Sequence, residues 1–183
     1  MGFFEPDRYF SRVSAIDIQK DIVGLGFQYV LLDIDNTILA RSTYEISRDA
    51  GAWLAKARDA GLSFCLLSNN WHHVVHDLAD QLQLPIVSHA VKPLPPAFLI
   101  AMGKIKAKRK ATLVIGDQLI TDVLGAHFIG LKAYLVCPLV EQDLKHTLML
   151  RNLERALIGH LRPEGANWGI EDTAIRRTRR ERP

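Results

Sequence analysis

Short apolar runs alternate with longer stretches of helical periodicity from residue 29 onward. The runs are rich in branched residues and are typical of buried strands; they occupy residues 29–34, 62–67, 113–115 and 133–137, with a shorter run at 86–87. Between them, apolar residues recur at the i, i+3, i+4 and i+7 spacing of an amphipathic helix, beginning near Ala50, Val74, Phe98 and Ile120. This alternation predicts an α/β fold, a Rossmann-like parallel sheet flanked by helices.

The two ends of the chain fall outside this pattern. We expect residues 1–160 to form a single domain, in which residues 1–26 are an N-terminal arm of one or two short helices. Residues 141–160 are expected to form a closing helix. Residues 161–183 are rich in Arg, Gly and Pro and predict a mobile basic tail.

Composition and charge narrow the class of protein. The chain is 48% hydrophobic and 23% charged, which is ordinary for a soluble globular protein. Its formal net charge of +3 belongs to the tail, because the last eight residues hold five arginines and one acid. We therefore expect no nucleic-acid partner. Two cysteines without metal-ligand spacing predict free thiols, and no apolar stretch suits a membrane span or secretory signal, so we expect a cytoplasmic protein.

Polar side chains follow each of the strongest predicted strands. Asp33, Asp35 and Thr37 follow the first, Ser68 and Asn69 the second, and Asp117 and Asp122 the third, while Lys92 precedes a helix. Because the carboxyl ends of parallel strands meet at one edge of a sheet, these side chains are expected to converge. Converging carboxylates repel one another, and oxygen ligands without His or Cys favour Mg²⁺ as the counter-charge.

Such a group of side chains can transfer a phosphoryl group. One carboxylate can attack phosphorus while Mg²⁺, a hydroxyl and an ammonium hold the equatorial oxygens. A second carboxylate two residues further on can give a proton to the leaving alcohol and then remove one from water. A structural explanation is also open, because Asp and Asn favour tight turns after strands. The joint occurrence of four such polar segments makes this explanation less favoured.

Four strings resemble the motifs of the haloacid dehalogenase (HAD) superfamily, in its usual chain order: LLDIDNTI, LLSNN, AVKPLPPAF and VIGDQLITDVLGAHFIG. The resemblance implies that Asp33 is the nucleophile and a metal ligand, and that Asp35 is the acid/base whose backbone carbonyl also binds Mg²⁺. It further implies that Asp117 is a metal ligand and that Ser68, Asn69 and Lys92 bind phosphate. Thr37 would brace the first turn, and Asp122 would orient Lys92 or a metal-bound water.

In detail, the strings are similar to the YqeG-like group of HAD subfamily IIIA phosphatases. That group includes a branch acting on phosphatidylglycerophosphate, so the resemblance implies a phosphomonoesterase, with a lipid-borne substrate and peripheral contact at the inner face of the membrane as one expectation. Residues 36–67 and 69–91 are too short for a cap domain, which favours an open site, or one closed by a neighbouring subunit in a homo-oligomer. The alternatives are a phosphatase of a soluble sugar phosphate or nucleotide, and a non-catalytic binding protein.

Two other groups of residues have a functional and a structural interpretation. His72, His73 and His76 could bind a metal at i, i+4 spacing, but exposed helix histidines are the favoured interpretation because no third ligand follows. Aromatic residues at the N-terminus, including Phe4, Tyr9 and Phe10, could insert into a membrane, although packing onto the domain is favoured.

Overall fold

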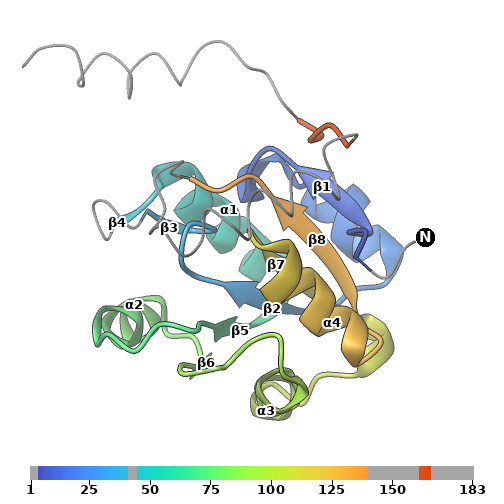
Figure 1. Ribbon diagram of the computed structural model, residues 1–183. Coiled ribbons are helices and arrows are strands. Elements are labelled where there is room, and N and C mark those ends of the chain that lie inside the picture. Colours follow the sequence, from blue (N-terminus) through green and yellow to red (C-terminus); the bar gives the residue numbers. More distant parts are fainter. Residues whose placement is uncertain (1–3, 41–44, 140–160, 166–183) are drawn as a thin grey trace, which may run out of the picture.

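The computed structural model describes residues 4–40, 45–139 and 161–165. Six parallel strands form one sheet in the order β1–β8–β7–β2–β5–β6 (Figure 1). They are β1 (Arg8–Phe10), β2 (Tyr29–Asp33), β5 (Ser63–Leu67), β6 (Ile86–Val87), β7 (Thr112–Gly116) and β8 (Lys132–Val136). A separate antiparallel pair joins β3 (Leu39–Ala40) to β4 (Glu45–Ile46). The predicted Rossmann-like α/β fold is confirmed.

Helices cover both faces of the sheet. They are α1 (Arg48–Asp59), α2 (Val74–Leu82), α3 (Pro95–Lys104) and α4 (Leu124–Phe128), with short turns η4 (Arg109–Ala111) and η5 (Leu119–Val123). One apolar cluster joins alternate strand residues such as Leu32 to α1 and α2, and the other joins Leu31 to α3 and α4. Because successive strand side chains point to opposite faces, burial of both faces explains the continuous apolar runs.

The N-terminal segment differs from the predicted helical arm. It contains the short turns η1 (Val13–Ala15), η2 (Ile18–Ile22) and η3 (Val23–Leu25), but Arg8–Phe10 forms the edge strand β1 and pairs with β8. The arm prediction is therefore wrong for these residues, because a three-residue strand is too short to show an alternating pattern. Phe10 is 1% exposed, so this aromatic packs onto the domain as favoured.

Part of the predicted mobile tail is also bound to the sheet. The Glu164 amide donates to the Tyr9 carbonyl at 2.8 Å, and the Ser11 amide donates to the Glu164 carbonyl at 2.9 Å. The Arg8 guanidinium pairs with the Glu164 carboxylate. Residues 161–165 thus extend the pairing at β1, which corrects the prediction for them. Residues 166–183 and the predicted closing helix at 141–160 lie outside the described residues.

No helix within the described part of the chain is both long and apolar enough to cross a bilayer. Both cysteines, Cys65 and Cys137, are free thiols, as predicted.

The direction of the strand order reverses at β2. From β2, the chain moves to β5 and β6 on one side, and then to β7 and β8 on the other. Connections that diverge in this way mark a switch point at the carboxyl ends of β2 and β7, which is where parallel α/β folds bind ligands. Asp33 ends β2, and Asp117 directly follows β7. The fold therefore places the predicted site residues at this switch point.

Candidate active site

The loop after β2 holds the first acidic pair in a tight turn. Asn36 adopts a left-handed conformation with φ of 63°, which asparagine tolerates better than most residues. Its amide donates to the Leu39 carbonyl at 2.8 Å, which closes the turn. The Thr37 hydroxyl donates to Asp33 Oδ2 at 2.8 Å. This contact ties the turn to Asp33, and the bracing role expected of Thr37 stays a prediction.

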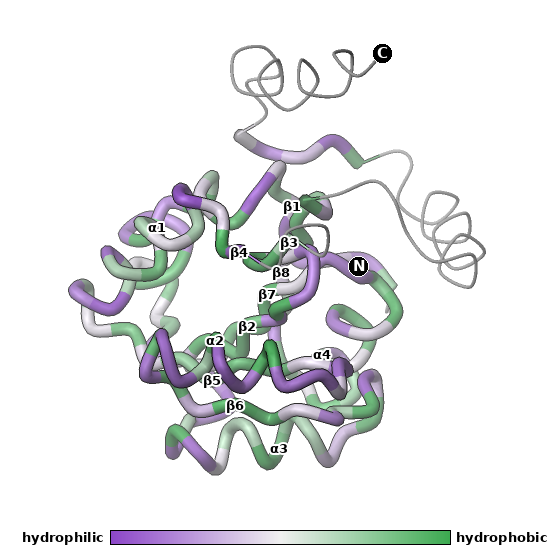
Figure 2. Tube along the Cα trace, turned by 90° about the vertical axis from the view of Figure 1, so that its left-hand side faces the viewer, coloured by the Kyte–Doolittle hydropathy of each residue, from purple (hydrophilic) through white to green (hydrophobic). Residues whose placement is uncertain are grey.

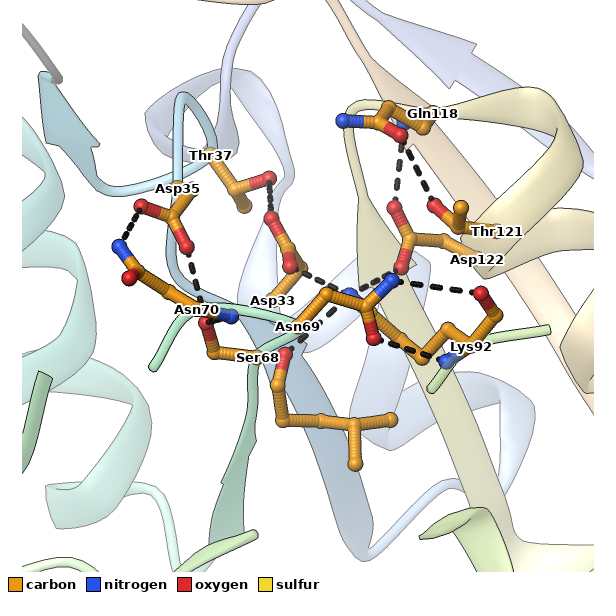
Figure 3. A network of polar contacts seen from close by, with 11 residues as sticks. Asp33, Asp35, Thr37, Ser68, Asn69, Asn70, Lys92, Gln118, Thr121 and Asp122 are labelled. Carbon is orange, nitrogen blue, oxygen red and sulfur yellow. Dashed lines mark hydrogen bonds and ion pairs between the residues drawn. The ribbon is translucent and has the colours of Figure 1, made fainter. Parts of the chain in front are cut away.

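Lys92 reaches this turn from the loop between β6 and α3. Its Nζ donates to Asp33 Oδ1 at 2.5 Å, to Asp122 Oδ1 at 2.6 Å and to the Leu67 carbonyl at 3.2 Å (Figure 3). These contacts use all three donors of the ammonium. The residue is only 6% exposed, so its charge is neutralised by the two carboxylates rather than by water.

Three buried carboxylates form the acidic part of the site. Oxygens of Asp33, Asp117 and Asp122 lie within 4.8 Å of one another, and each residue is at most 6% exposed. Gly116 is required for this arrangement, because a Cβ there would lie 2.3 Å from the Asp122 carboxyl carbon. An all-carboxylate set fits a hard divalent cation such as Mg²⁺. The Asp35 side chain is outside this group, and its predicted metal contact is through the backbone carbonyl.

The charged groups in this cluster shift one another's pKa values. Burial raises the pKa of Asp33 to about 7, aided by Asp122 and Asp35 and opposed by Lys92. Burial would lower the pKa of Lys92, but Asp122 and Asp33 together raise it above its usual value. Lys92 therefore remains an ammonium, and the carboxylates around it outnumber the available positive charge. A divalent cation would remove this imbalance.

Asp35 is held by the second motif. The Ser68 hydroxyl donates to Asp35 Oδ2 at 2.8 Å, and Asn70 Nδ2 donates to Asp35 Oδ1 at 3.0 Å. The Asn70 amide in turn donates to the Ser68 hydroxyl oxygen at 2.9 Å. Asn70 was not predicted from the sequence as a site residue. Its signal was a second carboxamide two positions after Ser68, within the same strand-end turn.

Asn69 clamps the backbone of Lys92. Its Oδ1 accepts from the Lys92 amide at 2.7 Å, and its Nδ2 donates to the Lys92 carbonyl at 3.2 Å. Asn69 thus holds the backbone of Lys92 on both sides, a pair of contacts that was not predicted from the sequence. Direct phosphate binding by Asn69, Ser68 and Lys92 stays a prediction.

Asp122 is fixed from its own loop. The Gln118 amide donates to Asp122 Oδ2 at 3.1 Å, and the Thr121 hydroxyl donates to Gln118 Oε1 at 3.2 Å (Figure 3). Asp122 presents its other oxygen to Lys92, and its expected role in orienting Lys92 or a metal-bound water stays a prediction. The histidines at 72, 73 and 76 are exposed and take no part in the carboxylate group.

Comparisons with known proteins agree with this fold and these four converging segments. Residues 89–138 match the family model described as HAD-hydrolase-like. The chain is 29% identical over 163 residues to the Bacillus subtilis (strain 168) protein named "Probable phosphatase YqeG", covering 89% of this chain and 94% of that relative. The chain is thus similar to HAD-type hydrolases over residues 89–138, and to YqeG over most of its length.

Solved structures share the fold at low sequence identity. An uncharacterized protein from Listeria monocytogenes serotype 4b aligns with a TM-score of 0.51 and 17% identity, over 64% of this chain and 85% of that one. The cobalt-bound deoxy-D-mannose-octulosonate 8-phosphate phosphatase from Haemophilus influenzae aligns with a TM-score of 0.50 and 13% identity, over 73% of this chain and 88% of that one. These similarities support the fold alone.

Proposed function

We propose that the protein is a HAD-type phosphatase, which hydrolyses a phosphate monoester through an aspartyl-phosphate at Asp33. An Asp33 carboxylate oxygen attacks phosphorus, and the bond from phosphorus to the ester oxygen breaks. Asp35 gives its proton to the leaving alkoxide, so that an alcohol departs. Asp35 then accepts a proton from a water that attacks the same phosphorus, which releases inorganic phosphate and restores Asp33. The observation that carries this proposal is the convergence of Asp33, Lys92 and Asp122 in one buried cluster.

The metal in this proposal is Mg²⁺. Asp33, Asp117 and the Asp35 backbone carbonyl would hold the ion, and the donor chemistry of the acidic cluster fits it. When bound, the ion supplies positive charge to the phosphoryl oxygens. Lys92 supplies a second positive charge, while Asp122 and the Asn69 clamp hold it in place. Ser68 contributes its hydroxyl to the phosphoryl oxygens once the substrate displaces Asp35 from it.

For the substrate, we propose the lipid phosphatidylglycerophosphate. The support is the resemblance of the four motif strings to the YqeG-like group and the short links between the motifs, which hold only small elements among the described residues. A site without a cap domain leaves room for a phosphate that is carried on a large or surface-bound molecule. The competing substrate is a soluble sugar phosphate or nucleotide.

Phosphate release tests this proposal. The full chain is assayed with Mg²⁺ on phosphatidylglycerophosphate in mixed micelles and on a panel of sugar phosphates and nucleotides, with Asp33→Asn as the inactive control. We expect kcat/KM to be highest for the lipid and to vanish in the variant. A faster soluble substrate would move the assignment to that metabolite. No release from any phosphate ester would favour a binding protein.

A further inference from the structure

Helix α3 exposes apolar side chains on the face that it turns to solvent. Ala97, Phe98, Ala101 and Met102 are buried against the sheet, as expected for its inner face. On the outer face, Leu99 and Ile100 are 47% and 54% exposed, and the helix carries no charge before Lys104. In Figure 2, α3 lies at the margin of the molecule next to β6. A helix that is apolar on both sides needs a second apolar surface to cover it.

The two other long helices do not share this feature. The exposed residues of α1 include Lys56, Arg58 and Asp59, and those of α2 include Asp77 and Asp80. Both helices therefore show the ordinary arrangement, with a polar face to water and an apolar face to the core. The exposed apolar side chains on the outer face of α3 are thus a feature of this helix that α1 and α2 do not share.

A dense group of basic residues follows α3 directly. Lys104, Lys106, Lys108, Arg109 and Lys110 are all exposed. No acidic residue occurs between Asp80 and Asp117, so nothing within residues 81–116 offsets these charges. Exposed aliphatic side chains beside exposed lysines are the pattern by which proteins bind the surface of an anionic membrane.

The loop that leads into α3 holds two further exposed apolar residues. Val91 and Leu94 are 59% and 54% exposed, and they flank the site residue Lys92 in the loop that leads into α3. The Leu94 amide donates to the Val91 carbonyl at 3.0 Å, which holds both residues in one turn. Exposed apolar residues thus occur from the loop that holds Lys92 into α3, and the basic group follows directly in the sequence.

We propose that this surface, formed by Val91, Leu94, Leu99, Ile100 and the bases of residues 104–110, docks the protein on anionic lipid bilayers. Nucleic acid would match the lysines, but it offers no partner for exposed aliphatic side chains. A second copy of the chain could cover the apolar residues, but residues 81–116 offer no acidic partner for the bases. A bilayer can bury the apolar side chains, and its anionic headgroups can pair with the bases. Docking in this way would place the loop that holds Lys92 next to the lipid.

Vesicle binding tests the proposal without any need for turnover, so its result is independent of the proposed substrate. The full chain is centrifuged with sucrose-loaded vesicles of phosphatidylcholine, with or without phosphatidylglycerol. Leu99→Gln/Ile100→Gln removes the apolar half, and Lys108→Gln/Lys110→Gln removes two charges. The matched controls are Leu25→Gln, which alters an exposed leucine elsewhere, and Lys20→Gln/Lys56→Gln. Unchanged unfolding midpoints show that all variants fold.

We expect binding only to the anionic vesicles, weakened by salt. Each basic residue near an anionic surface strengthens binding by a factor of about five, so the double lysine variant loses roughly 25-fold. The double apolar variant loses at least about tenfold, while both controls bind as the unaltered chain does. Equal loss in variants and controls would overturn the proposal. So would binding to a labelled RNA that depends only on the lysines, or a dimer that disappears in the apolar variant.

Discussion

Lys92 Nζ lies 2.5 Å from Asp33 Oδ1, although the two residues are 59 positions apart in the sequence. The contact joins the end of the first central strand to the loop before α3, and it is buried on both sides. A buried ion pair is costly to break, because the remaining charge is left without a counter-charge or water. This contact therefore couples the integrity of the site to that of the fold.

Replacing Lys92 should damage both stability and activity. Lys92→Met keeps most of the apolar stem but leaves Asp33 and Asp122 side by side without an ammonium. We expect the free energy of unfolding to fall by about 3 kcal/mol in the absence of metal, and phosphate release to fall by at least about 100-fold. Urea unfolding and steady-state kinetics measure the two effects. Lys56→Met, at an exposed position on α1, is the matched control, and equal behaviour of both variants would contradict the role of Lys92.

Asp35 should be needed for turnover and dispensable for phosphate binding. Asp35→Asn keeps the shape of the side chain and its acceptor for Ser68, but it cannot transfer a proton. We expect kcat to fall by about 10² to 10⁴, the usual contribution of a general acid, while inhibition of aryl phosphate hydrolysis by vanadate stays within about twofold of the unaltered Ki. An unimpaired kcat would show that another group transfers the proton.

Asn69 should act through Lys92. Asn69→Ala removes both contacts to the Lys92 backbone, whereas Asn69→Asp keeps the acceptor for the Lys92 amide. We expect the alanine variant to lose roughly tenfold in kcat/KM, since misplaced catalytic groups are costly, and the aspartate variant to recover part of that loss. If the two variants are equally impaired, the clamp on Lys92 is not the relevant contact.

The stability of the metal-free protein should depend on pH through Asp33. Its folded-state pKa is raised to about 7, above the ordinary value of 3.8, so the folded state binds more protons between these values. The free energy of unfolding should therefore decrease as pH rises from about 4 to about 7. Urea titrations in EDTA measure this slope, which Asp33→Asn should flatten. Mg²⁺ should restore stability most strongly above pH 7, where Asp33 is ionised. A slope unchanged in Asp33→Asn would assign the effect to another group.

The sheet could be predicted because its strands are buried on both faces and so read as continuous apolar runs, as in residues 29–34. The convergence of Asp33, Lys92 and Asp117 also followed, since parallel strands carry their carboxyl ends to one edge. Strand β1 could not be predicted, because three edge residues carry too little pattern. The roles of Asn69 and Asn70 depend on which way each carboxamide turns, and only the tertiary contacts fix that direction.

The central claim is that Asp33 forms a covalent bond to phosphorus during turnover. Acid quenching during steady-state hydrolysis of an aryl phosphate, followed by borohydride reduction, converts an aspartyl-phosphate into homoserine, which peptide mass spectrometry locates. We predict homoserine at position 33 in the Asp35→Asn variant and in the unaltered chain, dependent on substrate and Mg²⁺. Active enzyme that yields no homoserine, or yields it at another aspartate, would contradict the claim.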